Sequence, residues 1–173
     1  MTVKAEPALQ RHPRGGIYFD DFVVNHLYEH PLRRTVTQMD NMLFSNMTLN
    51  PQPLHIDRHF CETETEWGQP LMNSLFTLGL MIGISVSDIS NGTTVANLGM
   101  TETRSPHPLF EGDTVHCTTE VLGKRESKSR PGAIRQSRSW CSTTRSSASR
   151  ASRTRWTGWR ATSSRPGAPG RAT

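Results

Sequence analysis

The most apolar segment of the chain runs from Leu71 to Val86, and hydrophobic residues cover nearly every side of it. Such a helix is typically buried all round, and the segment is shorter than the about 18–20 residues that a membrane span needs. We therefore predict a central core helix. Gly79 and Gly83 share one face of it, and each costs about 1 kcal/mol of helix propensity. We predict that a sheet approaches that face closely.

Outside this segment, alternating apolar and polar residues predict strands. Residues 114–121 place Val115, Cys117, Thr119 and Val121 on one face and polar residues on the other, as in a half-buried antiparallel strand. Ala96, Leu98 and Met100 share one face of an earlier strand. Residues 27–36 favour an extended stretch, in which Pro31 indicates a sheet edge or a strand start.

Two shorter helices are predicted before the core helix. Thr37 and Asp40 form a capping-box variant, and apolar residues follow at helical spacing: Met39, Met42, Leu43 and Met47. The prolines of the segment Asn50-Pro-Gln-Pro end this helix. Another helix runs from Asp57 to about Glu64. The order of elements predicts an α+β domain, with a buried helix against an antiparallel sheet.

The charge of +5 is unevenly distributed along the 173 residues. All 15 acidic residues lie before residue 134, whereas residues 134–173 hold nine Arg and no Lys, Asp or Glu. We predict a flexible N-terminus (1–15), one folded domain (16–132) and a Ser/Arg-rich tail (133–173).

The tail allows three interpretations. Its composition indicates disorder, or a basic arm whose Arg and Trp side chains bind nucleic acid. Three of the four Trp lie in it, which is unusual for a disordered tail. The third interpretation is a frame-shifted tail, because codons for Ser139–Thr144 can also encode Val-Val-Leu-Asp-His in another frame. A frame shift would leave the C-terminal part of the sheet incomplete.

Several classes of protein lack support in the sequence. Without a signal sequence or a membrane span, we expect a soluble, cytoplasmic protein. Cys61, Cys117 and Cys141 form neither a disulfide framework nor a metal site. We find no Gly-rich phosphate loop, nucleophile elbow or His/Cys metal cluster.

His55 is the first candidate for chemistry. It follows a rigid proline turn and precedes a helix, and a histidine can give or take a proton near neutral pH. The alternative is that His55 is a hydrogen-bonded polar residue of a turn.

Three motifs together resemble MaoC-like (R)-specific enoyl-CoA hydratases and dehydratases. They are Asn50–Asp57 (NPQPLHID), Glu66–Ser74 (EWGQPLMNS) and Pro108–Thr114 (PLFEGDT). The resemblance covers about residues 16–130, and its branch is similar to mesaconyl-CoA and itaconyl-CoA hydratases. It implies a hotdog fold, a sheet wrapped around a central helix. It also implies reversible hydration of an acyl-CoA double bond and a homodimer. CoA is part of the substrate, and no metal or other cofactor is implied.

The resemblance assigns candidate site residues. The family uses an Asp and a His five residues apart, which fall on Asn50 and His55. An amide cannot act as a general base, but Asn50 can orient a water molecule; Asp40 and Asp57 are possible substitute carboxylates. An oxyanion site is implied at the start of the core helix. The predicted substrate-binding residues are Gln52, Asn73, Ser74 and Leu75. Alternatively, Asn73 and Ser74 only cap the helix.

Cationic side chains suit the phosphates of CoA. The candidates are Arg104, His107, Lys124, Arg125, Lys128 and Arg130, each of which can also be ordinary solvated surface. Three functions follow from these patterns: an enoyl-CoA hydratase that works through His55, a non-catalytic acyl-CoA-binding protein, or a nucleic-acid binder that uses the tail.

Overall fold

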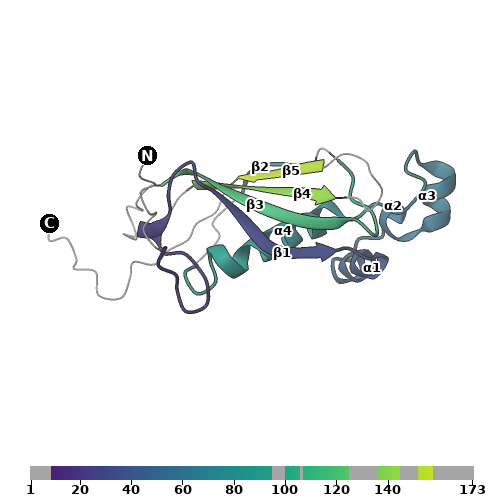
Figure 1. Cartoon of the computed structure of the whole chain (residues 1–173). Helices are drawn as coiled ribbons and strands as arrows, with labels where there is room; N and C mark the ends of the chain where they lie inside the picture. The colour runs from purple at the N-terminus through teal and green to yellow at the C-terminus, as the bar shows by residue number, and fades with distance from the viewer. Residues whose placement is uncertain (1–8, 95–99, 106, 125–135, 145–151, 158–173) are drawn as a thin grey trace.

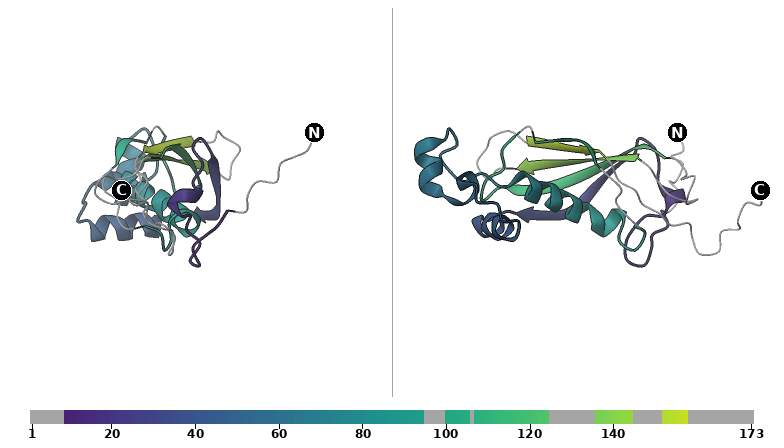
Figure 2. Two further views of the ribbon diagram at one scale, coloured as in Figure 1. Left: turned by 90° about the vertical axis from the view of Figure 1, so that its left-hand side faces the viewer. Right: turned by 180° about the vertical axis from the view of Figure 1, so that it is seen from behind.

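A computed structural model of the chain describes residues 9–94, 100–105, 107–124, 136–144 and 152–157. One antiparallel sheet of five strands has the order β1-β3-β4-β5-β2, and the helix α4 lies across one face of it (Figures 1 and 2). The strands are β1 (Leu27–Thr35), β2 (Thr101–Arg104), β3 (Thr114–Gly123), β4 (Gln136–Thr144) and β5 (Ser152–Thr157). The predicted α+β fold, with a helix against an antiparallel sheet, is confirmed.

The strands β1 and β3 match their sequence patterns closely. In β3, residues at every second position are buried, namely Val115, Cys117, Thr119 and Val121. Among the described strands, β1 lies at the sheet edge and pairs with β3 alone. Its register shifts between Glu29 and Arg33, around Pro31, because proline has no N–H to donate to the ladder. The edge position predicted from Pro31 is therefore confirmed.

The helix α4 (Ser74–Ile89) supplies the other half of the core. Met81, Ile84 and Ile89 pack against the sheet with Val115 and Val121. Burial on every side was wrong for the described chain, since Leu75 is 62% exposed. The expected close approach at Gly79 and Gly83 is not found among the described residues. Both glycines are exposed, and no described atom lies within 4 Å of a Cβ atom built at either.

The helix α1 (Gln38–Met47) begins at the predicted capping box of Thr37 and Asp40. Most of its apolar residues are exposed, and its two buried residues are polar, Asn41 and Ser45. Met39, Met42, Leu43 and Met47 are all exposed. A local apolar pattern therefore predicted the helix but not which of its faces is buried.

Two short helices follow, α2 (Pro53–Ile56) and α3 (Arg58–Glu64). Asp57 caps α3, with its carboxylate accepting from the Phe60 N–H at 3.0 Å. Figure 1 shows α1, α2 and α3 gathered at one end of the sheet. A 3₁₀ turn, η1 (Phe19–Asp21), lies near the N-terminus.

Two strands, β4 and β5, come from residues 133–173, where we expected a disordered or frame-shifted tail. Their backbone is described, and it pairs antiparallel with β3 and β2 on either side. The domain bounds at residues 16 and 132 and the reading frame of the tail stay predictions. The predicted strand through Ala96 and Leu98 falls largely on residues 95–99, outside the described residues. No helix in the described part of the chain is long and apolar enough to cross a membrane.

Candidate active site

The segment that leads into α4 meets the helix α2 and the segment that precedes β3. Leu71 is central to this meeting point, because its N–H donates to the Leu54 carbonyl at 2.9 Å and it bridges to Phe110. The next residue, Met72, donates its N–H to the Leu109 carbonyl at 2.9 Å. Parts of all three sequence motifs therefore come together here.

His55 lies half-buried on α2, where Pro53 stands at the first helical position and has a φ already suited to a helix. The His55 Nδ1 lies 2.7 Å from the Leu71 carbonyl oxygen. A carbonyl oxygen can only accept, so Nδ1 must carry the hydrogen. The Nε2 atom of neutral His55 is then the nitrogen with a free lone pair. Among the described residues, none hydrogen-bonds this Nε2.

Asn41 joins this site from α1 and was not singled out by sequence reasoning. It is fully buried. Its side-chain N–H groups donate to the His55 carbonyl at 2.7 Å and to the Leu71 carbonyl at 3.0 Å. Its Oδ1 accepts from the Asn73 N–H at 2.9 Å. The only local signal is a polar residue among apolar ones, which does not distinguish it from a surface position.

The start of α4 has both a cap and a free amide. The Asn73 side chain accepts from the Leu75 N–H at 2.9 Å, so Asn73 is the N-cap. The Leu75 amide is therefore occupied. No described residue accepts from the Ser74 N–H, which lies at the positive end of the helix dipole. Asn73 does cap the helix, as one interpretation held, whereas Ser74 leaves its own amide available.

A hollow of about 200 Å³ lies beside this amide. Trp67, Leu71, Met72, Ser74, Thr77, Ser105, His107, Pro108 and Leu109 line it. Its walls are mostly apolar, with hydroxyls and one imidazole as polar groups. His55 and Asn50 are not among the lining residues, but Leu71 both lines the hollow and accepts from the His55 ring.

Asn50 and Gln52 form a turn before α2. The Asn50 Oδ1 accepts from the Gln52 N–H at 3.1 Å, and the Gln52 carbonyl accepts from the His55 N–H at 3.0 Å. Asn50 is half-buried, and Gln52 is exposed. No hydrogen bond joins the Asn50 and His55 side chains, so within the described chain Asn50 shapes the turn.

The two possible substitute carboxylates both serve as helix caps. The Asp40 carboxylate accepts from the Thr37 N–H at 2.9 Å and pairs with Arg34. Burial opposes ionisation, but the bonds from Thr37 and the Arg34 guanidinium outweigh it and lower the pKa of Asp40. Asp57 is occupied by the N-terminus of α3. Neither carboxylate hydrogen-bonds the His55 ring.

The cationic candidates lie in different places. His107 lines the hollow, and Arg104 is exposed at the end of β2. Lys124 donates to the carbonyls of Asp20 and Phe22, at 2.9 and 3.2 Å, so its ammonium holds the N-terminal segment. Arg125, Lys128 and Arg130 lie outside the described residues. The described residues contain no group of three or more side chains arranged to hold a metal ion.

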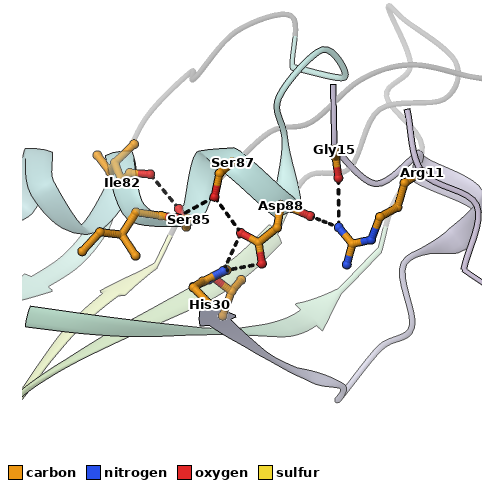
Figure 3. Close-up of polar contacts among 9 residues, drawn as sticks. Arg11, Gly15, His30, Ile82, Ser85, Ser87 and Asp88 are labelled. Carbon is orange, nitrogen blue, oxygen red and sulfur yellow. Dashed lines mark hydrogen bonds and ion pairs between the residues drawn. The ribbon is translucent and has the colours of Figure 1, made fainter. Parts of the chain in front are cut away.

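A second polar cluster, also missed from the sequence, lies at the other end of α4 (Figure 3). The His30 Nδ1 lies 2.9 and 3.0 Å from the two carboxylate oxygens of Asp88, and its Nε2 lies 2.8 Å from the Thr119 hydroxyl. His30 is only 5% exposed. Arg11 donates to the Asp88 carbonyl and so ties the N-terminal segment to this end of the helix. Both ring nitrogens are occupied, which indicates a structural role.

The fold and the half-buried histidine beside the core helix define a hotdog-type domain with a candidate acid–base site. A model of the MaoC-like domain matches residues 22–139, which is more than half of the chain. The chain therefore belongs to the MaoC-like dehydratase family. The expected family is thus confirmed.

Relatives agree with this assignment, and a solved structure agrees with the fold. The chain is 29% identical over 134 residues to a beta-methylmalyl-CoA dehydratase of Chloroflexus aurantiacus, covering 74% of this chain and 34% of that protein. It is 29% identical over 125 residues to a mesaconyl-CoA hydratase of Cereibacter sphaeroides, covering 69% and 34%. A Mycobacterium tuberculosis protein described as a double hotdog fold matches with a TM-score of 0.71 at 21% identity, covering 90% of this chain and 47% of that one. The chain spans about a third of the length of the curated relatives it matches.

Proposed function

We propose that the protein catalyses the reversible hydration of a 2-enoyl-CoA thioester to a 3-hydroxyacyl-CoA, as a hydro-lyase. The observation that carries this proposal is the His55 ring. Its Nδ1 is held by the Leu71 carbonyl, and its Nε2 has no partner in the described chain. A neutral imidazole held in this way is suited to act as a general base.

In the hydration direction, the His55 Nε2 takes a proton from water as the water oxygen bonds to C3. The electron pair of the C2=C3 bond moves toward the thioester, and its oxygen becomes negative. The enolate then takes the proton from the imidazolium at C2, so His55 returns to its neutral form. One water molecule is added, and no other reactant is needed.

The developing negative charge requires preorganised donors. The Ser74 N–H has no acceptor among the described residues and stands at the start of a helix that ends at Ile89, and such groups favour an anion. The hollow lined by Ser74 and Leu71 would hold the thioester. We assign Gln52, Asn73 and Leu75 to the surroundings of the substrate, with Asn73 acting through its cap.

Asn50 would orient the attacking water with its side-chain N–H groups, since its Oδ1 is occupied by the Gln52 N–H. The amide cannot accept the proton, and His55 therefore carries both proton transfers. A neutral Asn50 also removes the second negative charge that a family member with Asp would bring next to the enolate.

The direct test uses the purified full chain with crotonyl-CoA, mesaconyl-CoA and itaconyl-CoA, following loss of the enoyl-thioester absorbance. We expect turnover of at least one of them and a loss of about 10²- to 10⁴-fold in His55→Ala. His59→Ala, an exposed histidine on α3, is the matched control and should keep full activity. A folded wild type that turns over none of the three thioesters would refute the proposal.

Asn50 favours one other candidate, a non-catalytic acyl-CoA-binding protein that kept the fold. This candidate predicts that CoA esters raise the melting temperature without being hydrated. We further propose a homodimer working in the cytoplasm; sedimentation at several concentrations tests the assembly. Nucleic-acid binding rests on tail side chains outside the described residues and stays a prediction, tested by salt-dependent retention of DNA.

A further inference from the structure

We propose that Asn41 is a positioning residue that sets the orientation and tautomer of the His55 ring and, through the same amide, the start of α4. This inference rests on the proposed function. It concerns a residue that lies on α1 and that, in the described structure, reaches the site only through other groups.

The first argument is the burial of Asn41. It is fully buried on a helix whose exposed face carries Met39, Met42, Leu43 and Met47. Burying an amide costs free energy unless its donors and acceptor are paired. Here both N–H groups and the oxygen are paired, and every partner is a backbone group. The site therefore holds the Asn41 side chain in one orientation.

The second argument is the identity of the backbone groups to which Asn41 donates. Asn41 donates to the carbonyl of His55 itself, at 2.7 Å, and to the carbonyl of Leu71, at 3.0 Å. The Leu71 oxygen is the same atom that accepts from the His55 ring, at 2.7 Å. One carbonyl oxygen thus accepts from both side chains, and Asn41 fixes the acceptor that decides which ring nitrogen carries the hydrogen.

The third argument is the link to the oxyanion site. The Asn41 Oδ1 accepts from the Asn73 N–H at 2.9 Å, and Asn73 in turn caps α4 ahead of Ser74. A single amide therefore connects the proposed base and the proposed oxyanion donor. Displacement of a reacting group by about 1 Å can cost about 100-fold in rate.

The test compares Asn41→Ala and Asn41→Asp with Ser45→Ala. Ser45 lies one turn along the same buried face, and its hydroxyl has no hydrogen-bond partner among the described residues. We expect both Asn41 variants to lose about 100-fold in kcat with KM changed less than about threefold, and Ser45→Ala to keep both. Asn41→Asp retains the size and the acceptor for Asn73, so it serves if Asn41→Ala does not fold.

The second readout is the ¹⁵N chemical shift of the His55 ring in the full chain. The wild type should show the tautomer with hydrogen on Nδ1, and the folded Asn41 variants should gain the Nε2–H tautomer. A wild type with the Nε2–H tautomer overturns the proposal, as do folded variants with unchanged kcat and tautomer. This readout needs no turnover. An inactive wild type would therefore refute the proposed reaction, while the tautomer of the His55 ring would still test the positioning role.

Discussion

Two histidines lie near opposite ends of α4, and their surroundings differ in one decisive respect. His30, near the C-terminal end, is buried with Asp88 on one ring nitrogen and Thr119 on the other. His55, near the N-terminal end, is half-buried, and among the described residues only its Nδ1 has a partner, the Leu71 carbonyl. A ring with both nitrogens paired holds segments together. A ring with one nitrogen held and the other free is prepared for proton transfer.

The largest expected effect comes from replacing each of the two histidines, because one replacement should lower activity and the other should lower stability. His55→Gln should lower kcat by about 10²- to 10⁴-fold and change the free energy of unfolding by only about 1 kcal/mol, the contribution of one hydrogen bond. His30→Gln should do the reverse and keep kcat per folded molecule. Steady-state kinetics and urea unfolding of both variants measure this. Equal kinetic losses in the two would show that the comparison is wrong.

The next effect concerns Asp88. Asp88→Ala leaves the buried Nδ1–H of His30 without its acceptor, and an unsatisfied buried polar group costs about 1–3 kcal/mol. Urea unfolding should show this loss, while the KM for the enoyl-CoA substrate stays constant. Ser87→Ala is the control, since Ser87 is exposed and its hydroxyl makes two 3.3 Å contacts, one with the Ile84 carbonyl and one with the Asp88 carboxylate. A loss no larger than that of the control would contradict the structural role of the pair.

A substitution at the N-terminal end of α4 should have a smaller effect, on both folding stability and acyl-CoA binding. Asn73→Ala removes the cap that accepts from the Leu75 N–H, and loss of such a cap costs about 1 kcal/mol. Because Ser74 follows directly, we also expect weaker binding of acyl-CoA. Asp57→Ala removes the matching cap of α3 and should lower stability without changing KM. The two variants are compared by thermal unfolding and by the KM.

Patterns confined to one segment predicted much of the fold. The alternation in β3, the capping box at Thr37 and the edge position of Pro31 all depend on neighbouring residues, and the structure contains each of them. The partners that decide burial lie far away in sequence. His30 and Asp88 are 58 residues apart, and Asn41 meets Asn73 across 32 residues.

The errors have the same physical origin. The helical spacing of Met39, Met42 and Leu43 is local, but which face of α1 is buried depends on backbone groups of the segments at His55 and Leu71. For the candidate site, a motif predicted His55 and the start of α4. It could not show that the Leu75 amide is occupied while the Ser74 amide lacks an acceptor in the described chain, because that depends on the rotamer of Asn73.

The face of α4 between its two ends gives a further, smaller prediction. Gly79 is exposed, and no described atom lies within 4 Å of a Cβ atom built there. Gly79→Ala should therefore stabilise the chain by about 0.5–1 kcal/mol through helix propensity, at concentrations where the chain is monomeric. Urea unfolding measures it. Destabilisation at every concentration would show that another segment covers this face.

The smallest effect tests whether a carboxylate takes part in the proton transfer proposed for His55. Burial opposes ionisation of Asp40, but bonds from Thr37 and the charge of Arg34 outweigh it and lower the pKa of Asp40 below its ordinary range. A carboxylate with a lowered pKa stabilises the fold above its unfolded pKa, and this contribution is lost as the pH falls through the folded value. Asp40→Asn should therefore be less stable than the wild type by about 0.2–1 kcal/mol near neutral pH. The difference should shrink only below about pH 4.

Activity distinguishes the two roles of Asp40. A cap bonded to Thr37 and Arg34 has no part in proton transfer, so Asp40→Asn should keep kcat and its pH profile near neutral pH. If Asp40 instead served as the base that Asn50 cannot be, the same variant would lose activity to the extent that His55→Gln does. Urea unfolding from pH 3 to 7, together with kcat near pH 7, measures both quantities on one protein. We expect a pH-dependent loss of stability with unchanged turnover, which would leave His55 as the base.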